Sequence, residues 1–133
     1  MQPAAATTIS RSENAKIEVV KASYEAFIAK DRVAIEALIA DDFHFTSPLD
    51  NRIDRATYFD RCWPLSKRIE SFEFMKVAAS GNRVFVTYVG RMDGNSFQNT
   101  EIATVREGKI VEVEVYFGWS IPHRAKLGGF IAM

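Results

Sequence analysis

The feature that most constrains the fold of this chain is the stretch 97–118, FQNTEIATVREGKIVEVEVYFG. Two runs flank the turn sequence Arg106-Glu107-Gly108-Lys109, so the stretch predicts a long β-hairpin. In the second run the residues alternate strictly, with Val111, Val113, Val115 and Phe117 on one face and Glu112, Glu114 and Tyr116 on the other. Alternation with a period of two predicts a strand in a sheet with one buried face.

The first run of this hairpin places a carboxylate on its more apolar face. That face carries Phe97, Asn99, Glu101, Ala103 and Val105. If this is the buried face, Glu101 points into the interior of the protein. A buried carboxylate is costly unless it has partners, so the placement indicates either a functional site or a bracing hydrogen-bonded network.

The residues before this hairpin predict helices. Ser10-Arg11-Ser12-Glu13 fits a capping box, and an apolar stripe at helical spacing follows it, formed by Ile17, Val20, Tyr24, Phe27 and Ile28. Asp31 can cap a second, shorter helix, whose stripe consists of Ile35, Leu38 and Ile39. Asp54 can cap a third helix, which Trp63-Pro64 ends.

Strands are predicted once before the third helix and repeatedly after it. Residues 43–47 indicate a short strand, and Leu49-Asp50-Asn51-Arg52 a turn. Residues 71–79 and 84–92 then predict two strands ahead of the hairpin. The order helix, helix, strand, helix and four antiparallel strands predicts an α+β fold. We expect a flexible N-terminus at 1–9, one domain at 10–119 and a C-terminal tail at 120–133.

Composition excludes several classes of function. The 133 residues carry 17 basic and 17 acidic side chains, so no net charge favours nucleic acid or a membrane surface. The single cysteine, Cys62, excludes an intrachain disulfide and a cysteine-cluster metal site. No apolar run is long enough to span a membrane, and the N-terminus lacks a secretory signal, so we expect a cytoplasmic protein.

Short motifs along the chain resemble the nuclear-transport-factor-2-like superfamily, and within it the SnoaL-like group. They are Tyr24–Phe27 before Lys30-Asp31, Ala37–Phe43, Ser47-Pro48, and Gly108-Lys109-Ile110 leading to Tyr116-Phe117-Gly118. The resemblance covers roughly residues 13–119. It implies a cone-shaped, curved, mainly antiparallel sheet wrapped around three N-terminal helices, with a pocket at the wide end and dimerisation through the outer sheet face. The superfamily includes ketosteroid isomerase, polyketide cyclases, dehydratases, epoxide hydrolases and domains with no known reaction.

The functional residues of those relatives carry over only in part. The general base of the isomerase falls at Ser47, and its oxyanion-site acid falls at Glu101. Its oxyanion tyrosine falls at Ser23, one residue from Tyr24. This chain keeps one of the three functional groups of the isomerase, so steroid isomerase activity is not expected. The histidine and aspartate used by the cyclases have no counterpart at His44 or His123.

We therefore expect a pocket for a small hydrophobic molecule, with Glu101 as acid or acid-base, Asn99 as its orienter, and Tyr24 and Ser47 as secondary polar groups. The expected ligand contacts are Phe27, Phe45, Tyr58, Cys62, Trp63 and Phe117. Any reaction would be cofactor-free proton transfer, namely isomerisation, cyclisation, dehydration or hydration. A non-catalytic ligand-binding module and a dimerisation module with a filled interior remain open.

Two local groups also have a structural interpretation. The hydroxyl of Ser47 can simply cap the end of its strand before Pro48, and Cys62 can be a buried thiol in an apolar lid. Arg52, Arg55 and Arg61 lie among three aspartates, a mixture of signs typical of a solvated, salt-bridged surface.

Overall fold

A computed structural model describes residues 10–132, so the predicted flexible N-terminus at 1–9 lies outside the described residues. The described residues form three α-helices, one 3-10 helix and six strands. In chain order they are α1 Arg11–Ala29, α2 Arg32–Leu38, β1 Ile39–Ser47, β2 Asp50–Asp54, α3 Arg55–Arg61, η1 Trp63–Lys67, β3 Ile69–Ser80, β4 Arg83–Met92, β5 Asn95–Arg106 and β6 Lys109–Ile121.

The helices begin where the predicted capping residues stand. The Ser10 hydroxyl accepts a hydrogen bond from the backbone N–H of Glu13 at 3.0 Å, which completes the capping box of α1. Asp31 and Asp54 cap α2 and α3 in the same way, each accepting from a backbone N–H three residues further on. Lys30, with φ of 57°, ends α1 in the left-handed conformation. The predictions of these three helix starts are confirmed.

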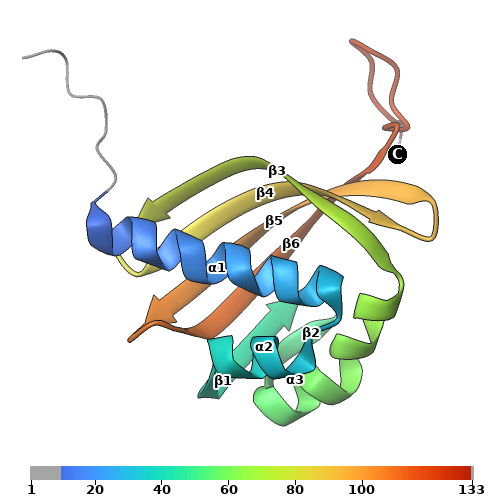
Figure 1. The fold of residues 1–133 in the computed structure, drawn as a ribbon. Coiled ribbons are helices and arrows are strands. Elements are labelled where there is room, and N and C mark those ends of the chain that lie inside the picture. The colour runs from blue at the N-terminus through green and yellow to red at the C-terminus, as the bar shows by residue number, and fades with distance from the viewer. Residues whose placement is uncertain (1–9, 133) are drawn as a thin grey trace, which may run out of the picture.

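The strands form one curved, open sheet in the order β2-β1-β6-β5-β4-β3. Neighbours are antiparallel except β1 and β6, which run parallel, so the sheet is mixed. Figure 1 shows α1 running across one face of this sheet, with α2 and α3 at the end near β1 and β2. The predicted α+β class, with a curved sheet around N-terminal helices, is confirmed.

The prediction of a turn at 49–52 is wrong, because strand β2 already begins at Asp50. The turn lies at Pro48-Leu49 instead. β2 is an edge strand of five mostly polar residues that pairs with β1 alone, so it has no alternating apolar pattern to reveal it. The sheet therefore has six strands where the sequence predicts five.

Two further boundaries differ from the prediction. β1 begins at Ile39 and not at Phe43, because the chain passes directly from the last turn of α2 into the sheet. β6 continues to Ile121, beyond the end of the predicted hairpin at Gly118. Within residues 10–132, none of the helices combines the length and the apolar character needed to cross a membrane.

The inner face of the sheet packs against α1 to form the core. Val84 and Val86 of β4, Val105 of β5 and Phe43 of β1 are all at most 1% exposed. The α1 residues in the same core are Ile17, Val20 and Tyr24 of the predicted stripe, together with Ala26. This packing fills one part of the interior, and the remaining part stays open as a cavity.

Candidate functional site

A cavity of about 610 Å³ lies between the inner face of the sheet and the helices. Nine of the ten predicted site residues line it: Tyr24, Phe27, Phe45, Ser47, Tyr58, Cys62, Asn99, Glu101 and Phe117. Trp63 does not line it, and its ring packs edge-on against Phe27, with ring centres 5.4 Å apart. The predicted residues therefore gather around one cavity, which has an apolar wall and a few polar groups, as small-molecule sites have.

Glu101 is a half-buried residue on the wall of this cavity, and its carboxyl group is shielded by the surrounding protein. It points inward from β5, as the alternation of that strand predicts, and lines the cavity. The hydroxyl of Tyr88 on β4 donates a hydrogen bond of 2.6 Å to its Oε2 atom. Asn99 does not reach Glu101 directly. Its Nδ2 atom donates to the Tyr88 hydroxyl at 3.4 Å, so it acts on Glu101 through Tyr88.

Each hydrogen bond in the group of Gly118, Asn99, Tyr88 and Glu101 is donated toward Glu101. The backbone N–H of Gly118 donates to Oδ1 of Asn99 at 3.1 Å, which fixes that oxygen as the acceptor end of the amide. The Asn99 amino group then donates to Tyr88, and the single proton of Tyr88 is left for Glu101. The chain Gly118, Asn99, Tyr88, Glu101 therefore delivers an O–H donor to the carboxyl group.

Gly118 has a steric requirement at this point. A Cβ atom there would lie 1.9 Å from the carbonyl oxygen of Gln98, because β5 and β6 come close at an irregularity in their pairing. Only glycine allows this approach and so keeps its N–H within reach of Asn99.

Burial dominates the electrostatics of Glu101. Desolvation raises the pKa of Glu101, and the hydroxyls of Tyr88 and Tyr24 oppose this shift only in part. Burial, followed by the charge of Glu101, also raises the pKa values of Tyr24 and Tyr58. These phenols therefore keep their protons and remain hydrogen-bond donors.

The Tyr24 hydroxyl lies beside this carboxyl group. It is fully buried and makes no hydrogen bond of normal geometry among residues 10–132, yet it lies near enough to Glu101 to lower the pKa of that carboxyl group. Its ring is fixed by edge-on contacts with three aromatic side chains, those of Phe72, Phe74 and Tyr88, with ring centres 5.1–5.4 Å apart. A buried hydroxyl without a partner of normal geometry is costly, and the Glu101 carboxyl group is the acceptor that lies beside it.

Asp50 is a second carboxylate on the cavity, which no pattern in the sequence indicated. The side chain of Asp50 is 8% exposed, forms an ion pair with Nε of Arg61 at 2.6 Å and accepts a 2.7 Å hydrogen bond from the Ser47 hydroxyl. Ser47 also accepts from the backbone N–H of Leu49 at 3.0 Å, so it closes the β1–β2 turn and orients Asp50. A prediction of strand β2 would have placed Asp50 on the cavity side of the sheet.

The remaining candidates have little chemistry of their own. Burial, followed by the negative charge of Asp50, raises the pKa of Cys62 to about 11, so its thiol is a poor nucleophile at neutral pH. In the described part of the chain, no three side chains of His, Cys, Asp or Glu gather in a way that could hold a metal ion. What the cavity offers is acid and base groups in an apolar enclosure.

A curved sheet covered by helices, with a cavity between them that holds buried acids, defines a class of α+β pocket domains. The sequence profile described as the SnoaL-like domain matches residues 20–113, more than half of the chain. The chain therefore belongs to the SnoaL-like family, within the superfamily of nuclear-transport-factor-2-like proteins.

Solved structures show the same fold. An epoxide hydrolase from Mycobacterium tuberculosis described as LEH-like has a TM-score of 0.68 and 18% identity over 80% of this chain and 85% of its own. A proposed polyketide cyclase from Xanthomonas campestris has a TM-score of 0.66 and 22% identity, covering 80% and 92%. A proposed ketosteroid isomerase from Kribbella flavida has a TM-score of 0.69 and 14% identity, covering 80% of each. No curated protein matches the chain.

Proposed function

We propose that this SnoaL-like domain binds a small, largely apolar molecule in the cavity and transfers protons to and from it without a cofactor. The observation that carries the proposal is Glu101, a buried carboxyl group of raised pKa that lines an apolar cavity and is positioned by a directed chain of hydrogen bonds. Perturbed acids in clefts are typical of catalytic sites.

Glu101 is the proton donor in this mechanism. Its raised pKa extends the protonated form to higher pH, so that it can donate to an oxygen of the bound molecule. The Tyr24 hydroxyl supports Glu101 and does not touch the bound molecule, because its oxygen atom is inaccessible from the cavity. A fixed acid stabilises the negative charge that develops when a proton leaves the carbon next to a carbonyl.

Asp50 is the proton acceptor in this mechanism. The expected position of the base holds Ser47, whose own hydroxyl is engaged with Asp50. Ser47 and Arg61 hold the Asp50 carboxylate on the cavity wall, where a proton from the substrate could be received. Isomerisation, cyclisation, dehydration and hydration all need such an acid and base on one cavity.

A second function, ligand binding without chemistry, is favoured by the serine at position 47. Deuterium incorporation distinguishes the two functions. Hydrophobic lactones, steroids and aromatic ketones that raise the melting temperature would be incubated with the protein in D₂O. Proton-transfer chemistry predicts deuterium at the carbon beside the carbonyl, and its loss in Glu101→Gln with binding retained. Binding without deuterium exchange in the wild-type protein would exclude the catalytic proposal for those ligands and support the binding module.

A homodimer through the sheet also belongs to this proposal. Strand β6 leaves Tyr116, Trp119 and Ile121 between 40% and 53% exposed. Burying such side chains against a second copy of the sheet would remove their apolar surface from water.

A further inference from the structure

A second depression lies on the outside of the helical layer, where α2, α3 and η1 meet. It is lined by Arg32, Arg55, Ala56, Phe59, Asp60, Trp63, Pro64 and Lys67. None of these residues lines the cavity that holds Glu101. The depression is thus a separate feature, which the proposed acid-base chemistry does not use.

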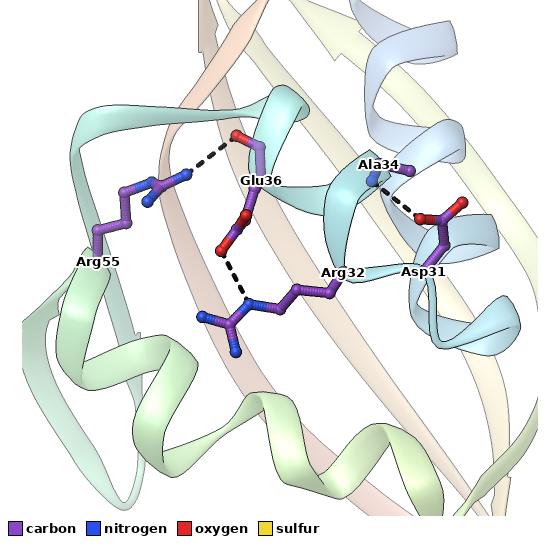
Figure 2. A network of polar contacts seen from close by, with 5 residues as sticks. All are labelled: Asp31, Arg32, Ala34, Glu36 and Arg55. Atoms are coloured by element: carbon purple, nitrogen blue, oxygen red, sulfur yellow. Dashed lines mark hydrogen bonds and ion pairs between the residues drawn. The ribbon is translucent and has the colours of Figure 1, made fainter.

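Two arginines in this depression pack over the ring of Phe59. The guanidinium carbons of Arg32 and Arg55 lie 4.4 and 5.0 Å from the ring centre of Phe59. Figure 2 shows the same arginines converging on Glu36, one from α2 and one from α3. Nε of Arg32 pairs with the Glu36 carboxylate at 2.9 Å, and Nη2 of Arg55 donates to its backbone carbonyl at 3.0 Å. Groups held in this way lose little freedom when they bind a ligand.

The charges of the three arginines near α3 are not balanced equally. Arg52 pairs with Glu112, and Arg61 pairs with Asp50. Arg55 forms no ion pair among residues 10–132, and its buried Nε has no hydrogen-bond acceptor there. The expectation of a uniformly salt-bridged surface therefore fails at Arg55.

The rest of the lining adds positive charge and an apolar surface. Arg32 of this lining is paired with Glu36, whereas Arg55 and Lys67 have no ion pair in the described part of the chain, and Asp60 is the one carboxylate in the lining. The half-buried ring of Trp63 and the adjoining Pro64 provide apolar surface next to these cations. Two cations without an ion pair and an aromatic surface therefore meet in one place.

We propose that this depression binds an oxyanion, a carboxylate or a phosphate, on a small flat apolar body. The terminal Nη atoms of Arg55 would donate to the anion, because its Nε atom is buried and cannot reach a ligand. Lys67 adds a second positive charge, and the flat body packs on Trp63 and Pro64.

Intrinsic fluorescence can test this proposal. The chain has two tryptophans, so Trp119→Phe leaves Trp63 as the single indole reporter. Inorganic phosphate, phenyl phosphate and benzoate would be titrated at constant ionic strength. The proposal predicts saturable changes, with phenyl phosphate binding more tightly than inorganic phosphate because its ring adds the apolar contact. Benzoate against phenyl phosphate distinguishes the carboxylate from the phosphate. No saturable change with any of the three probes would overturn the proposal.

Variants in the same background identify the residues that bind. Arg55→Gln should weaken the preferred aryl anion about tenfold or more, because it removes hydrogen bonds to a charged group. Lys67→Gln should weaken it less and leave the melting temperature unchanged, since Lys67 is exposed and has no packing role. Arg83→Gln, which removes an exposed arginine outside the depression, is the matched control and should bind as the parent does. Equal weakening by Lys67→Gln and Arg83→Gln would overturn the proposal.

Discussion

Tyr88→Phe tests the hydrogen-bonded chain around Glu101 without changing the shape of the core. The substitution removes one oxygen, which donates to Glu101 at 2.6 Å and accepts from Asn99 at 3.4 Å. A hydrogen bond to a charged group contributes about 1.5–3 kcal/mol, and one between neutral groups about 0.5–1.5 kcal/mol. The cost of the substitution should therefore be larger when Glu101 is ionised than when it is protonated.

The pH window of this effect follows from the raised pKa of Glu101. At a pH below 4.5, the ordinary value of glutamate, Glu101 is protonated in the folded protein. Between that value and the raised pKa the folded protein binds more protons than the unfolded chain, so stability falls as the pH rises through this window. Tyr88→Phe should steepen this fall, because the phenol favours the ionised form of Glu101.

Urea unfolding of wild type and Tyr88→Phe, at acid and at alkaline pH, measures the cost. Tyr116→Phe is a matched control, because the Tyr116 hydroxyl donates to the Glu114 carboxylate at 2.8 Å on the exposed surface. Under conditions where the protein is monomeric, Tyr116→Phe should leave the free energy of unfolding unchanged at either pH. A Tyr88→Phe cost that is the same at both pH values, or no larger than that of Tyr116→Phe, would refute the reasoning.

Three other experiments test separate parts of the structure. Gly118→Ala should destabilise the protein by about 1–3 kcal/mol in urea unfolding, because its Cβ would overlap the carbonyl oxygen of Gln98 at 1.9 Å, whereas Gly129→Ala, with 3.4 Å to its nearest neighbour, should change little. Cys62 should react with a disulfide reagent more slowly in the folded than in the urea-unfolded protein, and a rate that levels off below pH 9.0, its ordinary pKa, would contradict the shift to about 11. Tyr116→Lys should make the proposed dimer monomeric in sedimentation experiments, and an unchanged dimer would place the interface elsewhere.

The parts of the fold that local sequence determines could be predicted. A helix start depends on a capping side chain three residues from its partner, so Ser10, Asp31 and Asp54 could be identified. The direction of Glu101 depends on alternation within β5 alone, which is why it could be predicted from one strand. Edge strand β2 could not, because pairing with β1 and not its own pattern makes it a strand.

The hydrogen-bond partners of Glu101 depend on the register between β4 and β5, which could not be predicted from the sequence. Tyr88 lies directly opposite Asn99 across β4 and β5, and that pairing is what places its hydroxyl beside Glu101. Alternation with Val84 and Val86 would have placed Tyr88 on the inner face, but not next to this carboxyl group. Asp50 was missed for the same reason, because it reaches the cavity only through the pairing of β1 with β2.

A direct titration of Glu101 tests the central claim that this SnoaL-like domain holds a buried acid on its cavity. Carboxyl carbons of ¹³C-labelled glutamate would be followed by NMR across the pH range, with Glu101→Gln used to assign the signal. The structure predicts that Glu101 titrates above the ordinary value of 4.5 and above the exposed glutamates, and that a bound apolar ligand alters its titration. A Glu101 signal that titrates at or below 4.5 would contradict the account.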